Sequence, residues 1–146
     1  MNTCTFFGHR DTPDSIEPIL ISTIKNLIET QSVKIFYLGN NGNFDTLTRK
    51  ILKNLATQYP PVKYYVVLAY PPYKKHNTYL DYSDTIYPQE LVNVLPKYAI
   101  IKRNEWLINH SDYVISYVKY STGGAKTFTD NALKKGKNVI NIATLE

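Results

Sequence analysis

Several features that would narrow the class of this protein are scarce or missing. The chain has one cysteine, Cys4, in 146 residues, which excludes an intramolecular disulfide framework and suits a reducing compartment. No apolar run approaches the roughly 18 residues of a membrane span. The first residues lack the basic start of a signal peptide, and the apolar run after them ends at Gly8. We therefore expect a cytoplasmic protein with no membrane partner.

Length and composition indicate one globular domain over residues 1–146. Hydrophobic residues make up 43% of the chain and charged residues 20%, which is typical of folded rather than disordered proteins. A chain of this length buries about 70% of the surface of its unfolded form, so it needs no metal or disulfide to fold. The sequence contains no internal repeat, low-complexity tract or linker.

The charge of the chain is basic but diffuse. Lysine and arginine number 17 against 12 acidic residues, which gives a net charge of +5, and the excess is spread over both halves of the chain. Nucleic-acid-binding proteins usually gather such charge on one face or one helix. A small anionic ligand is therefore the favoured partner, and nucleic acid stays open as a less favoured one. The sequence also leaves open whether the chain forms a homo-oligomer.

Apolar, β-branched runs alternate with segments of helical periodicity. Strands are predicted over residues 3–7, 33–38, 64–69, 113–118 and 139–142, and helices over 14–30, 44–55, 103–109 and 125–135. This alternation predicts an α/β fold, with a Rossmann-like, doubly wound, mainly parallel sheet of about five strands flanked by helices. Ligands of such sheets bind outside the carboxyl ends of the strands, where most of the glycines fall.

The first glycine turn contains Gly8, His9 and Arg10. Glycine permits a sharp turn, and the planar fork of arginine suits a phosphate or a carboxylate. The alternative is a tight turn in which Arg10 is merely solvated. For His9, a role in stabilising the turn is more usual than a role as general base, because no carboxylate partner is singled out by its position in the sequence.

The second turn, with Gly42, Asn43 and Asp45, leads into the helix predicted over residues 44–55. Glycine and asparagine tolerate left-handed backbone and expose N–H groups to an anion. Asp45 has two interpretations. Its carboxylate either interacts with the start of the helix or accepts hydrogen bonds from the hydroxyls of a ribose.

The third turn contains Gly123, Gly124, Lys126 and Thr127 and leads into the last predicted helix. Paired glycines allow the backbone to approach a ligand closely, and the free N–H groups of a helix start favour phosphate. The segment lacks two further glycines that a P-loop requires, so it is not one. A turn that only caps the helix is the alternative to a phosphate site.

Other chemistries find little support in the sequence. The histidines at positions 9, 76 and 110 are scattered, so no metal-ligand spacing is present and no cofactor is expected. Neither a Gly-x-Ser-x-Gly elbow nor a cysteine nucleophile motif occurs. The segment 70–88 is rich in tyrosine and contains Lys74, Lys75 and His76. It suits either a lid that stacks on a base or an element of packing or dimerisation.

Several short motifs together carry a family resemblance. They are Phe7-Gly8-His9-Arg10, Gly42-Asn43-Phe44-Asp45, Arg103-Asn104-Glu105-Trp106-Leu107, Ser111-Asp112-Tyr113-Val114, Gly123-Gly124-Ala125, Ala132 and Gly136-Lys137-Asn138-Val139-Ile140. With these motifs the chain resembles the SLOG superfamily, the Rossmann-like group that contains DprA-type proteins and lonely-guy-type phosphoribohydrolases. Within it, the chain looks most like the small YpsA-like branch. The resemblance spans nearly the whole chain and is weakest over residues 70–100.

This resemblance implies a nucleotide or nucleotide-derived ligand of the phosphoribosyl or ADP-ribose type, bound as by a sensor or sponge. The expected phosphate-binding residues are Arg10, Gly123, Gly124, Lys126 and Thr127, the expected ribose-binding residues are Asn43 and Asp45, and Gly8, His9 and Gly42 complete the ligand-binding turns. Two other hypotheses stay open beside this one.

The first alternative is an N-glycosidase that acts on a nucleoside monophosphate or a related nucleotide. Arg103 and Asp112 reproduce the nine-residue interval of the lonely-guy enzymes, and Arg103 with Glu105 or Asp130 would stabilise the developing ribosyl cation. Asp130 stands where those enzymes have glutamate, and its shorter reach weakens the case for the same hydrolysis. The second alternative is a DNA-linked module, as the resemblance to DprA allows.

Overall fold

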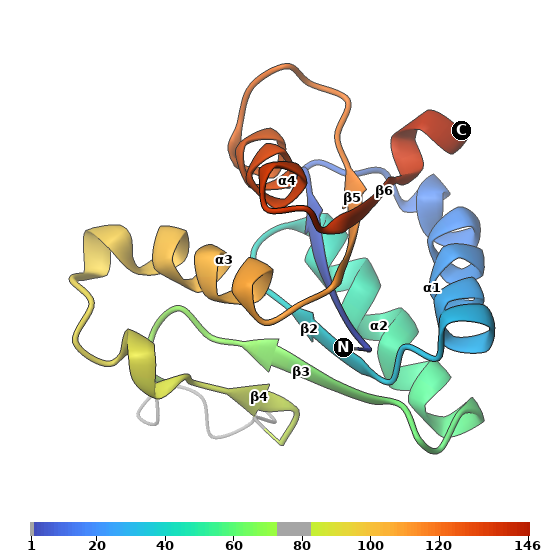
Figure 1. Cartoon of the computed structure of the whole chain (residues 1–146), viewed down its shortest axis with the longest axis horizontal. Coiled ribbons are helices and arrows are strands. Elements are labelled where there is room, and N and C mark those ends of the chain that lie inside the picture. The colour runs from blue at the N-terminus through green and yellow to red at the C-terminus, as the bar shows by residue number, and fades with distance from the viewer. Residues whose placement is uncertain (1, 73–82) are drawn as a thin grey trace.

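The computed structural model describes residues 2–72 and 83–146, which form a six-stranded parallel sheet with helices on both faces (Figure 1). The strands are β1 (Thr3–Gly8), β2 (Ile35–Leu38), β3 (Lys63–Val67), β4 (Thr85–Ile86), β5 (Tyr113–Tyr117) and β6 (Asn138–Asn141). Their order is β4-β3-β2-β1-β5-β6, and every neighbouring pair is parallel. The predicted doubly wound, Rossmann-like α/β fold is confirmed.

Four α-helices in the described part of the chain cover the two faces of the sheet (Figure 1). They are α1 (Glu17–Gln31), α2 (Asn43–Gln58), α3 (Ala99–Asn109) and α4 (Gly124–Lys134). Successive side chains of β1 point to opposite faces, so Phe6 packs among residues of α1 and α2 while Phe7 packs among residues of α3 and α4. Both faces of the central strand are therefore buried, which explains its continuous apolar run.

The first helix shows how the sequence pattern becomes packing. In α1, the apolar residues Leu20, Ile24 and Leu27 recur at helical spacing and are at most 2% exposed. The helix ends at Ser32, whose φ of 55° lies in the left-handed region. The turn that this residue makes returns the chain to the sheet, where β2 pairs with β1.

Two elements differ from the sequence-based prediction. The sheet has a sixth strand, β4, which is too short to show alternation and is recognised only by its pairing with β3. The third predicted helix begins at Ala99 instead of residue 103, directly after η3 (Pro96–Tyr98), a 3-10 turn that starts at a proline. The tyrosine-rich segment falls largely on residues 73–82, so the lid hypothesis lies outside the described residues.

Because the strands run the same way, the carboxyl ends of β1, β2 and β5 reach one edge of the sheet. The loops over residues 9–13, 39–42 and 118–123 therefore meet there. No helix in the part of the chain that the structure describes is both long and apolar enough to cross a membrane.

Candidate functional site

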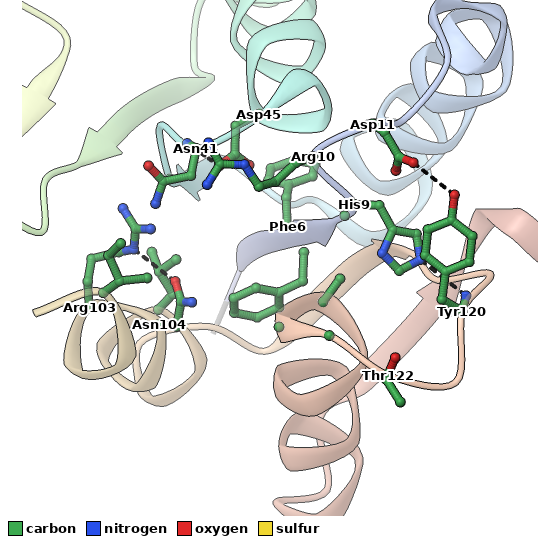
Figure 2. Close-up of a pocket in the computed structure, with 18 residues that line it drawn as sticks. Phe6, His9, Arg10, Asp11, Asn41, Asp45, Arg103, Asn104, Tyr120 and Thr122 are labelled. Carbon is green, nitrogen blue, oxygen red and sulfur yellow. Dashed lines mark hydrogen bonds between the residues drawn. The ribbon is translucent and has the colours of Figure 1, made fainter. Parts of the chain in front are cut away.

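A pocket of about 380 Å³ opens at this edge, between α3 and the start of α4 (Figure 2). Its polar lining comes from His9, Arg10, Asp11, Asn41, Asp45, Arg103, Asn104, Tyr120 and Thr122, and its remaining lining from Phe6, Phe7, Gly8, Gly39, Ile100, Leu107, Gly123, Gly124 and Ala125. The volume falls in the range of small-molecule sites. Three loops that are far apart in the sequence thus build one concave surface.

Arg103 is the most unusual residue of the pocket, because it is a charged residue that is only 2% exposed. Nε donates to Asn104 Oδ1 at 2.8 Å, and Nη1 donates to the Val67 carbonyl at 3.0 Å and to Asn40 Oδ1 at 3.3 Å. Nη2 donates to none of the residues that the structure describes. Two of the three nitrogens therefore fix the side chain to the end of β3 and to its own helix, and the third is left for the pocket.

Asp45 lies close to this guanidinium, beside Gly39. A Cβ on Gly39 would stand 2.9 Å from Asp45 Oδ2 and 3.1 Å from Arg103 Nη2, so only glycine leaves room for the two charged groups. Burial raises the pKa of Asp45 to about 6, although the Asn41 N–H and the positive charge of Arg103 oppose the rise. Burial also lowers the pKa of Arg103, which Asp45 opposes. Desolvation thus outweighs the attraction between the pair.

A hydrogen bond at the start of α2 holds the carboxylate of Asp45. Its Oδ2 accepts the backbone N–H of Asn41 at 2.9 Å, so the carboxylate completes the turn before the helix. Its Oδ1 accepts no hydrogen bond from the described residues. One oxygen therefore has a local structural role, and the other is available to a ligand in the pocket.

His9 joins the loop after β1 to the loop after β5. Its Nε2 accepts hydrogen bonds from the backbone N–H groups of Lys119 at 2.9 Å and Tyr120 at 3.3 Å, and the rings of His9 and Tyr120 have centroids 4.3 Å apart. The Tyr120 hydroxyl donates to Asp11 Oδ2 at 2.9 Å (Figure 2). Burial lowers the pKa of His9, and the charge of Asp11 opposes this shift. A neutral ring that accepts at Nε2 therefore positions the loop that leads into α4.

Gly8 and Gly42 bring the first and second loops into direct contact. A Cβ on Gly8 would overlap the ring of Phe44, which packs against the end of β1. Gly42 has a φ of 90°, and a Cβ there would lie 2.6 Å from the Cα of Arg10. Both glycines are therefore required by the packing of the start of α2 against the chain after β1.

The start of α4 is open toward the pocket. Its N-cap residue Gly123 has a φ of 106° and offers no side chain to the helix, and the first helical N–H groups have no partner within the helix. A Cβ on Gly123 or Gly124 would meet no atom of the described residues within 4 Å. The helix start thus has open space beside its first two glycines, which leaves room for a ligand there.

Arg10 contributes a second cation to the pocket. Its side chain makes no hydrogen bond or ion pair with the described residues and is exposed. Figure 2 shows it directed toward the side of the pocket on which Asn41 and Asp45 lie. Its backbone is fixed, because the Arg10 carbonyl accepts the Asn43 N–H at 2.9 Å. The guanidinium is therefore exposed and unpaired among the described residues, on a backbone held by this hydrogen bond.

Six of the predicted site residues do not line this pocket. They are Gly42, Asn43, Glu105, Lys126, Thr127 and Asp130. Asn43 Nδ2 donates to the Thr12 carbonyl at 2.6 Å and to Asp14 Oδ1 at 2.8 Å, so its amide is used in joining the first two loops.

The remaining side chains of this group are engaged near the surface of α3 and α4. Glu105 pairs with Lys102 at 3.3 Å, and Lys126 pairs with Asp130 at 2.9 Å, in each case within one helix. The Thr127 hydroxyl donates to the Gly123 carbonyl at 3.0 Å. The structure thus brings together Gly8, His9, Arg10, Asp45, Arg103, Gly123 and Gly124 among the predicted residues.

Sequence reasoning missed one wall of the pocket. Ile100, Asn104 and Leu107 line it from α3, and Asn104 also holds Arg103 in place. Their spacing of four and three residues places them on one face of a helix. The sequence pattern placed the start of this helix at residue 103, so the position of Ile100 on that face was not predicted.

No protein-family model matches this chain, and no curated protein matches it either. Within residues 2–72 and 83–146, no three histidine, cysteine, aspartate or glutamate side chains are grouped so that they could hold a metal ion. What the structure shows is a Rossmann-like parallel α/β protein with a polar pocket at the carboxyl ends of its central strands.

Proposed function

We propose that this chain binds a nucleotide-derived ligand that contains ribose and phosphate, of the phosphoribosyl or ADP-ribose type, as a sensor or sponge. One observation carries the proposal: the uncapped start of α4, the exposed cation of Arg10 and the carboxylate of Asp45 line the same pocket. With the sequence motifs, this supports membership in the SLOG superfamily and its small YpsA-like branch.

The phosphate group belongs at the start of α4. Gly124 and Ala125 line the pocket, and their N–H groups are unpaired within the helix. Arg10 brings a planar pair of donors from the opposite loop, and an arginine pairs with phosphate through two parallel hydrogen bonds. Together they neutralise an anion between the first and third loops.

The ribose belongs beside Asp45 and Arg103. The free Oδ1 of Asp45 suits a hydroxyl donor, and Nη2 of Arg103 suits a hydroxyl or ring oxygen as acceptor. Both groups are held by other contacts, at Asn41 for the carboxylate and at Val67 for the guanidinium. A site whose donors and acceptors are fixed in advance loses less freedom when the ligand binds.

Of the two hypotheses, binding of the ligand and its N-glycosidic hydrolysis, the positions of the carboxylates favour binding. The two carboxylates considered for N-glycosidic hydrolysis, Glu105 and Asp130, are absent from the pocket lining, and each pairs with a lysine of its own helix. A carboxylate outside the pocket does not reach the anomeric carbon of a ligand inside it.

Isothermal titration calorimetry with ADP-ribose, ribose 5-phosphate and adenosine tests the proposal. We expect the two phosphate-bearing compounds to bind and adenosine to bind much more weakly. Arg10→Ala should weaken binding roughly 10–150-fold, because one charge-assisted interaction with phosphate is lost. Lys134→Ala, which removes an exposed cation from the far end of α4, is the matched control.

Three outcomes would count against the proposal or a part of it. If none of the phosphate compounds binds, the assignment of the ligand class is wrong. An unchanged dissociation constant for Arg10→Ala removes that residue from the site. Release of free base during incubation with a nucleoside monophosphate, followed by chromatography, would replace the sensor with a hydrolase.

A further inference from the structure

Tyr120 stands at one side of the pocket, and its own contacts fix the position of its ring. The ring lies against the imidazole of His9, with 4.3 Å between the centroids and 33° between the planes. The hydroxyl donates to Asp11 Oδ2 at 2.9 Å, and the backbone N–H donates to His9 Nε2 at 3.3 Å. A ligand would therefore meet a ring that is already in place and lose little freedom in ordering it.

Much of this tyrosine is nevertheless open. Tyr120 lines the pocket and has an exposed fraction of 52%, although His9 covers one face of its ring and Asp11 accepts its hydroxyl. The exposure therefore belongs to the second face of the ring. An aromatic face that is held from behind and open in front suits stacking on a flat aromatic group of a ligand.

The ring adjoins the residues to which we assign the phosphate. Tyr120 comes three residues before Gly123, the N-cap of α4, and it packs on His9, the residue that precedes Arg10. Figure 2 shows Arg103 and Tyr120 at opposite sides of the pocket, with Arg10 between them. A phosphate at Arg10 and the start of α4 would thus have the ribose beside Arg103 on one side and the tyrosine ring on the other.

We infer that Tyr120 is the stacking platform for the base of the ligand, and that the phosphate groups lie in the middle of this ligand. The inference rests on the proposed function. In a nucleoside monophosphate, base and phosphate are attached to opposite ends of one ribose, so a ribose beside Asp45 would carry its base away from Tyr120. In a compound of the ADP-ribose type, a diphosphate joins the terminal ribose to a nucleoside, so the base lies beyond the phosphates and reaches the ring.

The chemical class is therefore a diphosphate that joins a ribose to a nucleoside. Every base has a π face, so stacking on the ring selects for the presence of a base and tolerates different bases.

Calorimetry with two ligands tests the platform. ADP-ribose carries the base, whereas ribose 5-phosphate has a ribose and a phosphate alone. We expect Tyr120→Leu to weaken the binding of ADP-ribose roughly 5–150-fold, because the stacking on one base is lost. The same variant should leave the dissociation constant of ribose 5-phosphate unchanged. Tyr98→Leu is the matched control and should change neither affinity, because Tyr98 has an exposed fraction of 47% and does not line the pocket.

Tyr120→Phe separates stacking from the positioning of the loop. This variant keeps the ring and loses the hydrogen bond to Asp11, so it should prefer ADP-ribose over ribose 5-phosphate about as strongly as the wild type does. A thermal melt of each variant checks that it is folded. Proton NMR gives an independent readout: the adenine protons of ADP-ribose should shift upfield on binding to the wild type, through the ring current of the tyrosine, and not on binding to Tyr120→Leu.

Two results would overturn this inference and leave the proposed function in place. Equal weakening of both ligands by Tyr120→Leu would assign Tyr120 to the position of the loop before α4, and an unchanged affinity for ADP-ribose would remove the ring from the site. A wild type that binds neither compound would instead refute the proposed function, and this inference with it.

Discussion

The imidazole Nε2 of His9 accepts the backbone N–H of Lys119 over 2.9 Å, although 110 positions separate the two residues in the sequence. This contact joins the loop after β1 to the loop after β5, and both loops line the pocket. Only a ring that is neutral at Nε2 accepts the bond. The shape of the pocket therefore depends on the protonation of one side chain.

We predict that His9 makes folding sensitive to mildly acidic pH. Burial lowers the pKa of His9 in the folded protein, so the unfolded chain binds the proton first as the pH falls. The stability that His9 contributes is therefore full above its ordinary pKa of about 6.5 and declines as the pH drops through that value. At neutral pH, His9→Ala should lower the free energy of unfolding by about 1–3 kcal/mol, because two N–H groups lose their acceptor.

Urea unfolding at several pH values checks this prediction. His9→Gln is the informative control, because its side-chain oxygen accepts an N–H without titrating. The difference in unfolding free energy between the wild type and His9→Gln should shrink as the pH falls from about 7.5 to about 5.5. A difference that stays constant over this range would show that His9 does not titrate with folding.

Arg103 should be essential to the stability of the pocket wall. Arg103→Met removes the donor to the Val67 carbonyl and leaves Asp45 without its nearby positive charge. A buried acceptor that loses its donor costs about 1–3 kcal/mol, and we expect a loss of at least this size. The double variant Arg103→Met/Asp45→Asn should recover part of it, because the buried carboxylate is then also removed. Chemical denaturation of Arg103→Met, Asp45→Asn and the double variant is the measurement, and additive losses would refute the coupling.

Gly124→Val separates a phosphate site from a helix start with no ligand. A Cβ at this position meets no described atom within 4 Å, so the variant should fold with a melting temperature close to that of the wild type. We expect the valine side chain to crowd a phosphate bound at the start of α4, so ADP-ribose should no longer bind. Gly124→Ala, with a single methyl group, should give an intermediate affinity. Full-affinity binding by folded Gly124→Val would exclude a phosphate at this turn.

Ligand affinity should fall in mildly acidic solution because of Asp45. The pKa of its carboxyl is raised to about 6 by burial, so its charge is lost as the pH falls through that value. A neutral carboxyl is a weaker acceptor for ribose hydroxyls than a carboxylate. The affinity for ADP-ribose should therefore drop between about pH 7 and about pH 5, up to tenfold per pH unit below the pKa of Asp45.

ADP-ribose is the suitable probe for this effect, because its phosphates are diesters, whereas a phosphate monoester has its own second pKa near 6. Calorimetry across this pH range, with Asp45→Asn as control, is the measurement. The variant should bind more weakly at neutral pH and show a flatter pH profile. If the two proteins have parallel profiles, the titrating group is a different one.

The sequence predicted those parts of the molecule that depend on local pattern. Apolar runs such as residues 113–118 and helical spacing such as Leu20, Ile24 and Leu27 identified the central strands and α1, since both faces of the sheet are covered. The sequence did not predict the edge strand β4, because its two residues, Thr85 and Ile86, are too few to show a periodic pattern and are identified as a strand only by their pairing with β3.

The candidate site was less predictable, because it depends on contacts across the fold. Asn43 was expected at a ribose, yet its amide is bonded to the Thr12 carbonyl, 31 residues earlier in the chain. The proximity of Asp45 in α2 to Arg103 in α3 could not be predicted from their spacing in the sequence either, because it depends on the absence of a side chain at Gly39. The glycine turns indicated the edge of the sheet at which the pocket lies, but the set of side chains that line the pocket depends on the packing of the whole fold.

The place of β1 in the sheet has a consequence for how the chain folds. One edge of β1 pairs with β2, while the other pairs with β5, in a register that joins Cys4 to Tyr113 and Gly8 to Tyr117. During synthesis on a ribosome, the second edge of β1 therefore stays unpaired until more than a hundred later residues have been added and β5 is available. During that interval the nascent chain exposes an open strand edge, which favours association with other chains. Chaperone demand should consequently be greatest before β5 is synthesised, and a high share of distant contacts should make refolding slow.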